Sequence, residues 1–212
     1  MARSTRRDFL KSTVAASVLS GAGGYAASTP AAKRTATDWV TLGNSNVKVT
    51  RLAFGTGTYS GRVQRELGQQ EFTRLVRYAY NRGIRFFETA DSYHGMPQML
   101  ATALKGIPRD SYKLMTKYNT HEMEDPQATI SRLRSDLGTD YVDIMLLHCV
   151  RNPQWSDNLE RLRDNFSEAK SKKVILAHGA SVHGLPALRS FPGNRWLDIA
   201  MIRMNHNGTR MD

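Results

Sequence analysis

The stretch Phe54-Gly55-Thr56-Gly57-Thr58-Tyr59 follows the first buried strand that the sequence predicts, and it decides between two folds. From residue 51 to residue 204, short apolar segments alternate with segments of helical periodicity. Such alternation is typical of a doubly wound parallel sheet or of a barrel. A doubly wound dinucleotide-binding domain carries a third glycine between its first strand and first helix. The stretch lacks that glycine, so we expect an α/β fold of the (β/α)8 TIM-barrel type.

The predicted parallel strands are short, mostly apolar and bounded by polar or glycine-containing turns. They span residues 51–54, 85–89, 113–116, 142–147, 174–178 and 199–204. An antiparallel hairpin precedes them, with its turn at Gly43-Asn44. The best-marked helix begins with the capping residue Asp125 and Pro126 and stops at Gly138. About six βα units are therefore expected. A full barrel takes about 250 residues, so we expect a truncated barrel that lacks two units.

The N-terminal segment predicts a targeting signal. Thr5-Arg6-Arg7-Asp8-Phe9-Leu10-Lys11 resembles the twin-arginine signal, and residues 12–30 are uncharged and rich in small side chains. This uncharged stretch contains glycines and is weakly hydrophobic, so we expect no permanent membrane span in the mature form. The predicted domains are a signal peptide at 1–30, a polar linker at 31–38 and the barrel at 39–212. We therefore expect a periplasmic protein that is a client of the twin-arginine export machinery.

Charge and cysteine content exclude several classes of protein. The chain has 212 residues and a formal charge of +11, but its Lys and Arg residues are spread along amphipathic segments without an aromatic-rich basic run. Nucleic acid is therefore not an expected partner. Cys149 is the single cysteine. One thiol can form neither an intrachain disulfide framework nor a thiolate metal cluster.

Polar side chains stand at the carboxyl ends of the predicted strands, where barrel proteins place their reacting groups. Glu88 and Tyr93 follow the second strand, Lys117 the third and His148 the fourth. A phenol is a poor proton donor at neutral pH, and a nearby ammonium favours the phenolate and lowers the phenol pKa. A carboxylate can hold that ammonium, and an imidazole can fix a carbonyl oxygen. Such a set would let Tyr93 protonate a carbonyl oxygen as hydride reaches its carbon.

These residues resemble the catalytic set of the aldo-keto reductases, which carry Asp, Tyr, Lys and His at these strand ends in this order. Tyr93, Lys117 and His148 match that pattern, whereas Glu88 occupies the position of the acid. The resemblance extends from about Trp39 to Met204. It implies an oxidoreductase that transfers hydride between NADP(H) or NAD(H) and a small carbonyl or alcohol, with Tyr93 as the acid, Lys117 lowering its pKa, Glu88 orienting Lys117 and His148 positioning the carbonyl oxygen.

The same resemblance assigns residues to the cofactor. It implies that the nicotinamide is lined by the loop and strand-end residues Gly57, Thr58, Tyr59 and Ser181. The family's amide contacts come from a Ser-Asn pair and a Gln, but Val182 and Met201 occupy the latter two places. These side chains lack the hydrogen-bonding groups that an amide needs.

Two other functions remain open from the residues alone. His148, His183 and His206 follow three successive predicted strands, an arrangement that metal-dependent barrel hydrolases use. The departures at Glu88 and Val182 also suit a degenerate barrel that binds a ligand or partner without catalysis.

Overall fold

The computed structural model describes residues 33–121, 125–204 and 206–207. The predicted signal peptide, residues 1–30, lies outside the described residues. Contacts between Cα atoms divide the chain into Met1–Lys33 and Arg34–Asp212, and the second of these units carries the fold. Among the described residues, no helix has the length and apolarity that crossing a membrane requires.

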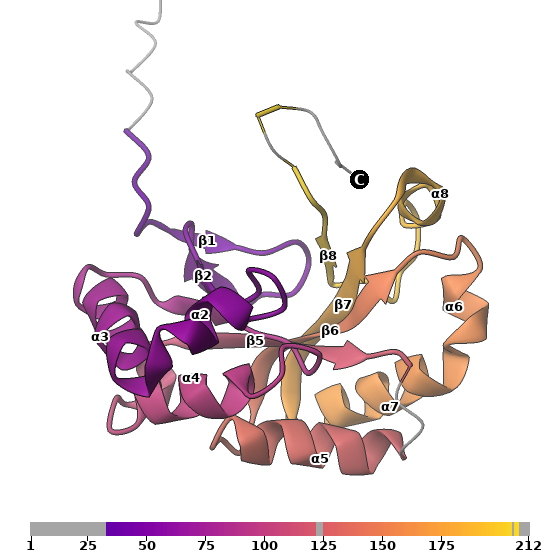
Figure 1. Cartoon of the computed structure of the whole chain (residues 1–212). Helices are drawn as coiled ribbons and strands as arrows, with labels where there is room; N and C mark the ends of the chain where they lie inside the picture. Colours follow the sequence, from indigo (N-terminus) through magenta and orange to yellow (C-terminus); the bar gives the residue numbers. More distant parts are fainter. Residues whose placement is uncertain (1–32, 122–124, 205, 208–212) are drawn as a thin grey trace, which may run out of the picture. The chain divides into compact units, whose positions relative to one another are not determined.

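A six-stranded parallel sheet is the centre of the second unit (Figure 1), and its strands lie side by side in chain order. They are β3 (Phe54–Gly55), β4 (Phe86–Glu88), β5 (Lys113–Asn119), β6 (Val142–Val150), β7 (Ile175–Val182) and β8 (Ile199–Met201). The predicted order of six parallel strands is confirmed. The predicted bounds of β5, β6 and β7 were wrong, because each strand runs three or four residues further, through polar residues that resemble a turn.

Helices follow one face of this sheet, with α3, α4, α5 and α7 side by side (Figure 1). The helical elements are α2 (Arg62–Glu66), α3 (Gly68–Asn81), α4 (Met96–Leu104), η1 (Arg109–Ser111), α5 (Pro126–Asp136), α6 (Trp155–Asn158), α7 (Glu160–Ser171) and α8 (Leu185–Leu188). The predicted start of α5 is confirmed, since the Asp125 carboxylate accepts hydrogen bonds from the backbone N–H groups of Gln127 and Ala128. Sequence analysis missed α4, which follows Tyr93 and begins at Met96.

Alternation along the strands sorts their side chains onto two faces. On β5, Leu114 and Tyr118 belong to the apolar cluster shared with the helices, whereas Met115 belongs to a second cluster on the inner face. Because side chains alternate along a strand, Lys117 has the same orientation as Met115. On β6, Ile144 and Leu146 are in the inner cluster and His148 is the next residue of that orientation. The polar strand-end residues thus form the layer above the inner apolar cluster.

An antiparallel hairpin of β1 (Trp39–Thr41) and β2 (Lys48–Thr50) packs against the inner cluster through Val47 and Val49. Its predicted turn is confirmed. The Asn44 backbone N–H donates to the Asp198 carbonyl at 3.2 Å, which ties the turn to the segment before β8. The turn also shares a hollow with Lys113, the first residue of β5. The hairpin therefore lies at the amino ends of the strands.

Candidate active site

A buried ion pair lies beneath a tyrosine at the carboxyl end of the sheet. The Lys117 Nζ donates to the Glu88 Oε1 and, at 3.0 Å, to the Tyr93 hydroxyl oxygen. Lys117 exposes 2% of its side chain and Glu88 exposes 9%. A charge so deeply buried is tolerated when an opposite charge and hydrogen bonds accompany it. The structure therefore brings Glu88, Lys117 and Tyr93 together, and Glu88 fixes the position of the ammonium.

Two neighbours hold the Tyr93 ring. A Cβ atom on Gly57 would lie 2.7 Å from the Tyr93 hydroxyl oxygen, so only glycine leaves room for the phenol at this position. The His148 imidazole packs edge-on against the ring, with centroids 5.6 Å apart and an interplanar angle of 84°. His148 thus joins the three residues above, and all four proposed catalytic residues meet at one edge of the sheet.

A β-bulge sets the position of His148. The register of β6 against β7 shifts between Leu147 and Val150, and within this shift Cys149 has a φ of 60°. Bulges of this kind re-aim a side chain and often lie beside active sites. The Ser181 hydroxyl oxygen accepts a hydrogen bond of 2.9 Å from the Cys149 backbone N–H, which the bulge removes from the regular ladder. Ser181 therefore stabilises the turn of backbone that presents His148.

Ser92 is a site residue that sequence analysis missed. Its hydroxyl lies 3.0 Å from the His148 Nδ1. Burial lowers the pKa of His148 from 6.5 to about 4, and the nearby Lys117 and His183 charges add to this effect. The imidazole is therefore neutral near pH 7 and carries one N–H. If the Ser92 hydroxyl donates to Nδ1, that N–H lies on Nε2. Adjacency to Tyr93 in the sequence was the one signal that could have identified Ser92.

The pKa of the Tyr93 phenol differs from the value that the sequence led us to expect. Burial raises the pKa of Tyr93 above its ordinary value of 10.0, and this effect exceeds the opposite effect of Lys117. Lys117 does favour the phenolate, but the expected net fall in the Tyr93 pKa is wrong for this structure. Because desolvation penalises the charged form, the phenol stays protonated near neutral pH. The protonated phenol therefore has the Lys117 ammonium beside its oxygen at 3.0 Å.

Two hollows adjoin this group. The smaller, of about 170 Å³, is lined by Tyr93, Lys117 and Ser181 together with the apolar side chains Val182 and Met201. The larger, of about 560 Å³, is lined by polar residues that include Ser92, Asn119, His121, Arg151 and His183. Tyr93 and His148 line both hollows. The phenol therefore borders both hollows, and apolar side chains form part of the wall of the smaller one.

The residues assigned to the nicotinamide are not all together. Ser181 lines the smaller hollow, and Gly57 lines the larger one against the tyrosine. Thr58 and Tyr59 line neither hollow. The Thr58 hydroxyl accepts from the Gln64 side chain, and Tyr59 is 74% exposed beside Arg62. Of the four, Ser181 is the one placed beside both Lys117 and Tyr93.

The acidic and histidine residues nearby fall into separate groups. Asp91 pairs with Arg132 of α5 at 2.9 Å and not with Lys117. His148 and His183 share the larger hollow, but His206 is absent from its lining. Within residues 33–121, 125–204 and 206–207, no three His, Cys, Asp or Glu side chains form a metal-binding group. The described residues therefore do not provide the predicted three-histidine ligand set.

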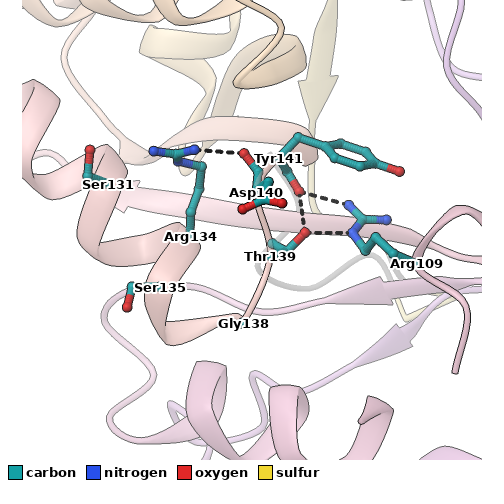
Figure 2. A pocket seen from close by; sticks show the side chains of 8 residues that line it. All are labelled: Arg109, Ser131, Arg134, Ser135, Gly138, Thr139, Asp140 and Tyr141. Carbon is teal, nitrogen blue, oxygen red and sulfur yellow. Dashed lines mark hydrogen bonds between the residues drawn. The ribbon is translucent and has the colours of Figure 1, made fainter. Parts of the chain in front are cut away.

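Figure 2 shows another hollow, of about 630 Å³, at the start of β6. The two arginines that line it are engaged in hydrogen bonds within the protein. The Arg109 guanidinium donates to the Thr139 hydroxyl at 2.8 Å and to the Tyr141 carbonyl at 3.0 Å, and Arg134 donates to the Asp140 carbonyl at 2.7 Å. Because these groups brace the loop before β6, we regard this hollow as structural in spite of its volume.

The fold and the site together define a parallel barrel-type protein with a tyrosine over a buried lysine–glutamate pair. Residues 51–211 match the Aldo/keto reductase family, and the chain belongs to this family. In fold, an aldo-keto reductase from Bacillus halodurans in its holo form is similar, with a TM-score of 0.56 and 26% identity. That similarity covers 69% of this chain and 50% of the Bacillus chain. The expected (β/α)8 barrel class is thus confirmed.

Relatives of known name agree with this assignment. Versiconal hemiacetal acetate reductase of Aspergillus parasiticus is 35% identical over 80% of this chain and 59% of its own length. Probable aldo-keto reductase 1 of Glycine max is 29% identical over 66% of this chain and 45% of its own length. The chain thus spans about half the length of these curated relatives.

Proposed function

We propose that the protein is an oxidoreductase that reduces a small carbonyl compound, or oxidises the corresponding alcohol, with NADP(H) or NAD(H). The observation that carries this proposal is the contact between the Lys117 Nζ and the Tyr93 hydroxyl at 3.0 Å, with Glu88 holding Lys117 from below. Membership of the aldo/keto reductase family and relatives named as reductases support it.

Reduction of a carbonyl group adds hydride to the carbon and a proton to the oxygen. Tyr93 gives the proton, since its phenol is protonated near neutral pH. As the proton leaves, negative charge develops on the phenol oxygen, 3.0 Å from the Lys117 ammonium. An ammonium placed where charge develops stabilises the transition state more than the ground state. Lys117 therefore acts on the product phenolate, and Glu88 keeps it in position.

His148 holds the carbonyl oxygen. Its imidazole is neutral and contacts the edge of the Tyr93 ring. With the Ser92 hydroxyl donating to Nδ1 at 3.0 Å, the Nε2–H is free to donate to the substrate. A neutral donor polarises the carbonyl group without supplying a second acid. Ser92 is thus a positioning residue that selects the tautomer of His148.

The smaller hollow fits the nicotinamide ring. Val182 and Met201 offer an apolar wall beside Tyr93 and Lys117, as a flat ring requires. The Ser181 oxygen already accepts from Cys149, but its own proton remains available for a carboxamide oxygen. The bound cofactor would supply the hydride. Ser181, Val182 and Met201 would hold it, with one side-chain hydrogen bond among them.

Isotope transfer tests the proposed reaction. NADPH and NADH with deuterium at both C4 positions are incubated with the full chain and 4-formylbenzamide, an uncharged aldehyde. We expect 4-(hydroxymethyl)benzamide that carries one deuterium on its alcohol carbon, measured by mass spectrometry and NMR. Absence of the alcohol with both cofactors, or alcohol without the label, would refute the proposed function.

We also propose that residues 1–30 direct the folded protein to the periplasm by the twin-arginine route, on the basis of the Arg6-Arg7 motif. Cell fractionation after replacement of both arginines by lysine tests this. The variant should remain in the cytoplasm, and unchanged export of the variant would refute the proposal.

A further inference from the structure

The larger hollow beside Tyr93 has an unusual distribution of charge. Its lining includes Arg151, His121 and His183, and no acidic residue is present among the described residues that line it. The hollow has a volume of about 560 Å³, which lies in the range of small-molecule sites.

Two described acids beside the site pair with other cations. Glu88 accepts from Lys117 inside the sheet, and Asp91 pairs with Arg132 at 2.9 Å. Arg151 is different, because no carboxylate of the described part of the chain lies within ion-pair distance of its guanidinium. The positive charge of Arg151 therefore borders the hollow, and none of the described carboxylates pairs with it.

Arg151 lies close to the proposed catalytic residues in both sequence and structure. Arg151 directly follows Val150, the last residue of β6, and His148 stands three residues before it. Both line the same hollow as Tyr93. Burial is the main cause of the lowered pKa of His148; the nearby Lys117 and His183 lower it further, and Asp91 raises it. A negative group on a substrate bound there would be attracted.

We infer that the substrate of this site is a small aldehyde or ketone that carries a carboxylate, which Arg151 binds. This inference rests on the proposed function and names its substrate class. A guanidinium matches the planar geometry and single charge of a carboxylate with two parallel hydrogen bonds. Arg151 is the one arginine among the described residues that line the larger hollow, and its single charge matches that of a carboxylate.

Two aldehydes of nearly equal shape test the inference. 4-Carboxybenzaldehyde carries the anion, and 4-formylbenzamide replaces it with a neutral amide. The measured quantity is the ratio of their kcat/KM values in the wild-type protein, in Arg151→Gln and in the control Lys105→Gln. Lys105 is exposed and follows α4, so its replacement removes one positive charge away from the larger hollow.

We expect Arg151→Gln to lower the ratio by about tenfold or more, the usual effect of a charge-assisted hydrogen bond. Lys105→Gln should keep the wild-type ratio. An equal ratio in wild type and Arg151→Gln would overturn the inference, as would an equal loss in both variants.

A binding measurement separates this inference from the proposed reaction. Calorimetry compares 4-(hydroxymethyl)benzoate with 4-(hydroxymethyl)benzamide on the same three proteins. We expect the benzoate to bind more tightly to wild type and to lose about tenfold in affinity in Arg151→Gln. If neither aldehyde is reduced, the proposed function fails, but calorimetry still decides whether Arg151 binds a carboxylate. Equal affinity of the benzoate for both proteins would overturn the inference.

Discussion

Lys117 exposes 2% of its side chain, yet it remains in the interior because its three donors have acceptors. Glu88 accepts one hydrogen bond, the Tyr93 hydroxyl another, and the Thr89 carbonyl lies at 3.4 Å. Glu88 is one methylene longer than the family's Asp, and this length still allows it to reach the ammonium. Burial favours the protonated form of Tyr93, whereas the Lys117 ammonium favours its phenolate.

The lowered pKa of His148 predicts a dependence of stability on pH. Between pH 6.5 and about 4, the unfolded chain binds a proton at His148 and the folded protein does not. The unfolded state then binds more protons, so the contribution of His148 to stability falls as the pH drops through this window. An NMR titration of the imidazole should give a midpoint near 4, and His148→Gln should lose less stability there than wild type.

A midpoint near the ordinary value of 6.5 would contradict the burial and charge environment described for His148. The same spectra identify which ring nitrogen carries the proton. We expect Nε2 in the wild-type protein and a mixture of tautomers in Ser92→Ala, with Ser92→Thr behaving as wild type.

At the level of elements, the bulge in β6 is the feature that sequence could not predict. A bulge depends on how β6 pairs with β7 across the sheet, and no residue pattern in Leu146-Leu147-His148-Cys149 specifies it. The strands themselves were predictable, because their apolar runs are continuous and bounded. The carboxyl-terminal bounds of these strands were not predictable. Polar residues such as Lys117 and Ser181 look like loop residues in the sequence, but they continue the alternation of a strand inside the sheet.

Ser181→Ala tests the role of the serine in the bulge. The substitution removes the acceptor for the Cys149 backbone N–H at a position where Ser181 is 4% exposed. Leaving a buried donor unpaired costs about 1–3 kcal/mol, so the free energy of unfolding in urea should fall by that amount. Thr116→Val is the matched control on β5, since the Thr116 hydroxyl is buried without a hydrogen-bond partner. Equal stability of Ser181→Ala and wild type would exclude this role.

On the scale of the whole molecule, the two ends of the sheet differ in what they carry. The hairpin covers the amino ends through Val47 and Val49, and the four proposed catalytic residues meet at the carboxyl ends. Sequence analysis predicted that the polar residues stand at the carboxyl ends of the strands, but not where the hairpin packs. The hollows were not predictable in the same way. Arg151 and Ser92 face the site only because separate strands and loops meet there.

The substitution Tyr93→Phe tests the central claim most directly. It keeps the ring that packs against Gly57 and His148 and removes the hydroxyl that Lys117 contacts at 3.0 Å. The measurement pairs steady-state reduction of 4-formylbenzamide with a fluorescence titration of NADPH binding. We predict that turnover falls by about a hundredfold to ten-thousandfold while the affinity for NADPH stays within about twofold of wild type. Turnover that is retained in Tyr93→Phe would contradict the account.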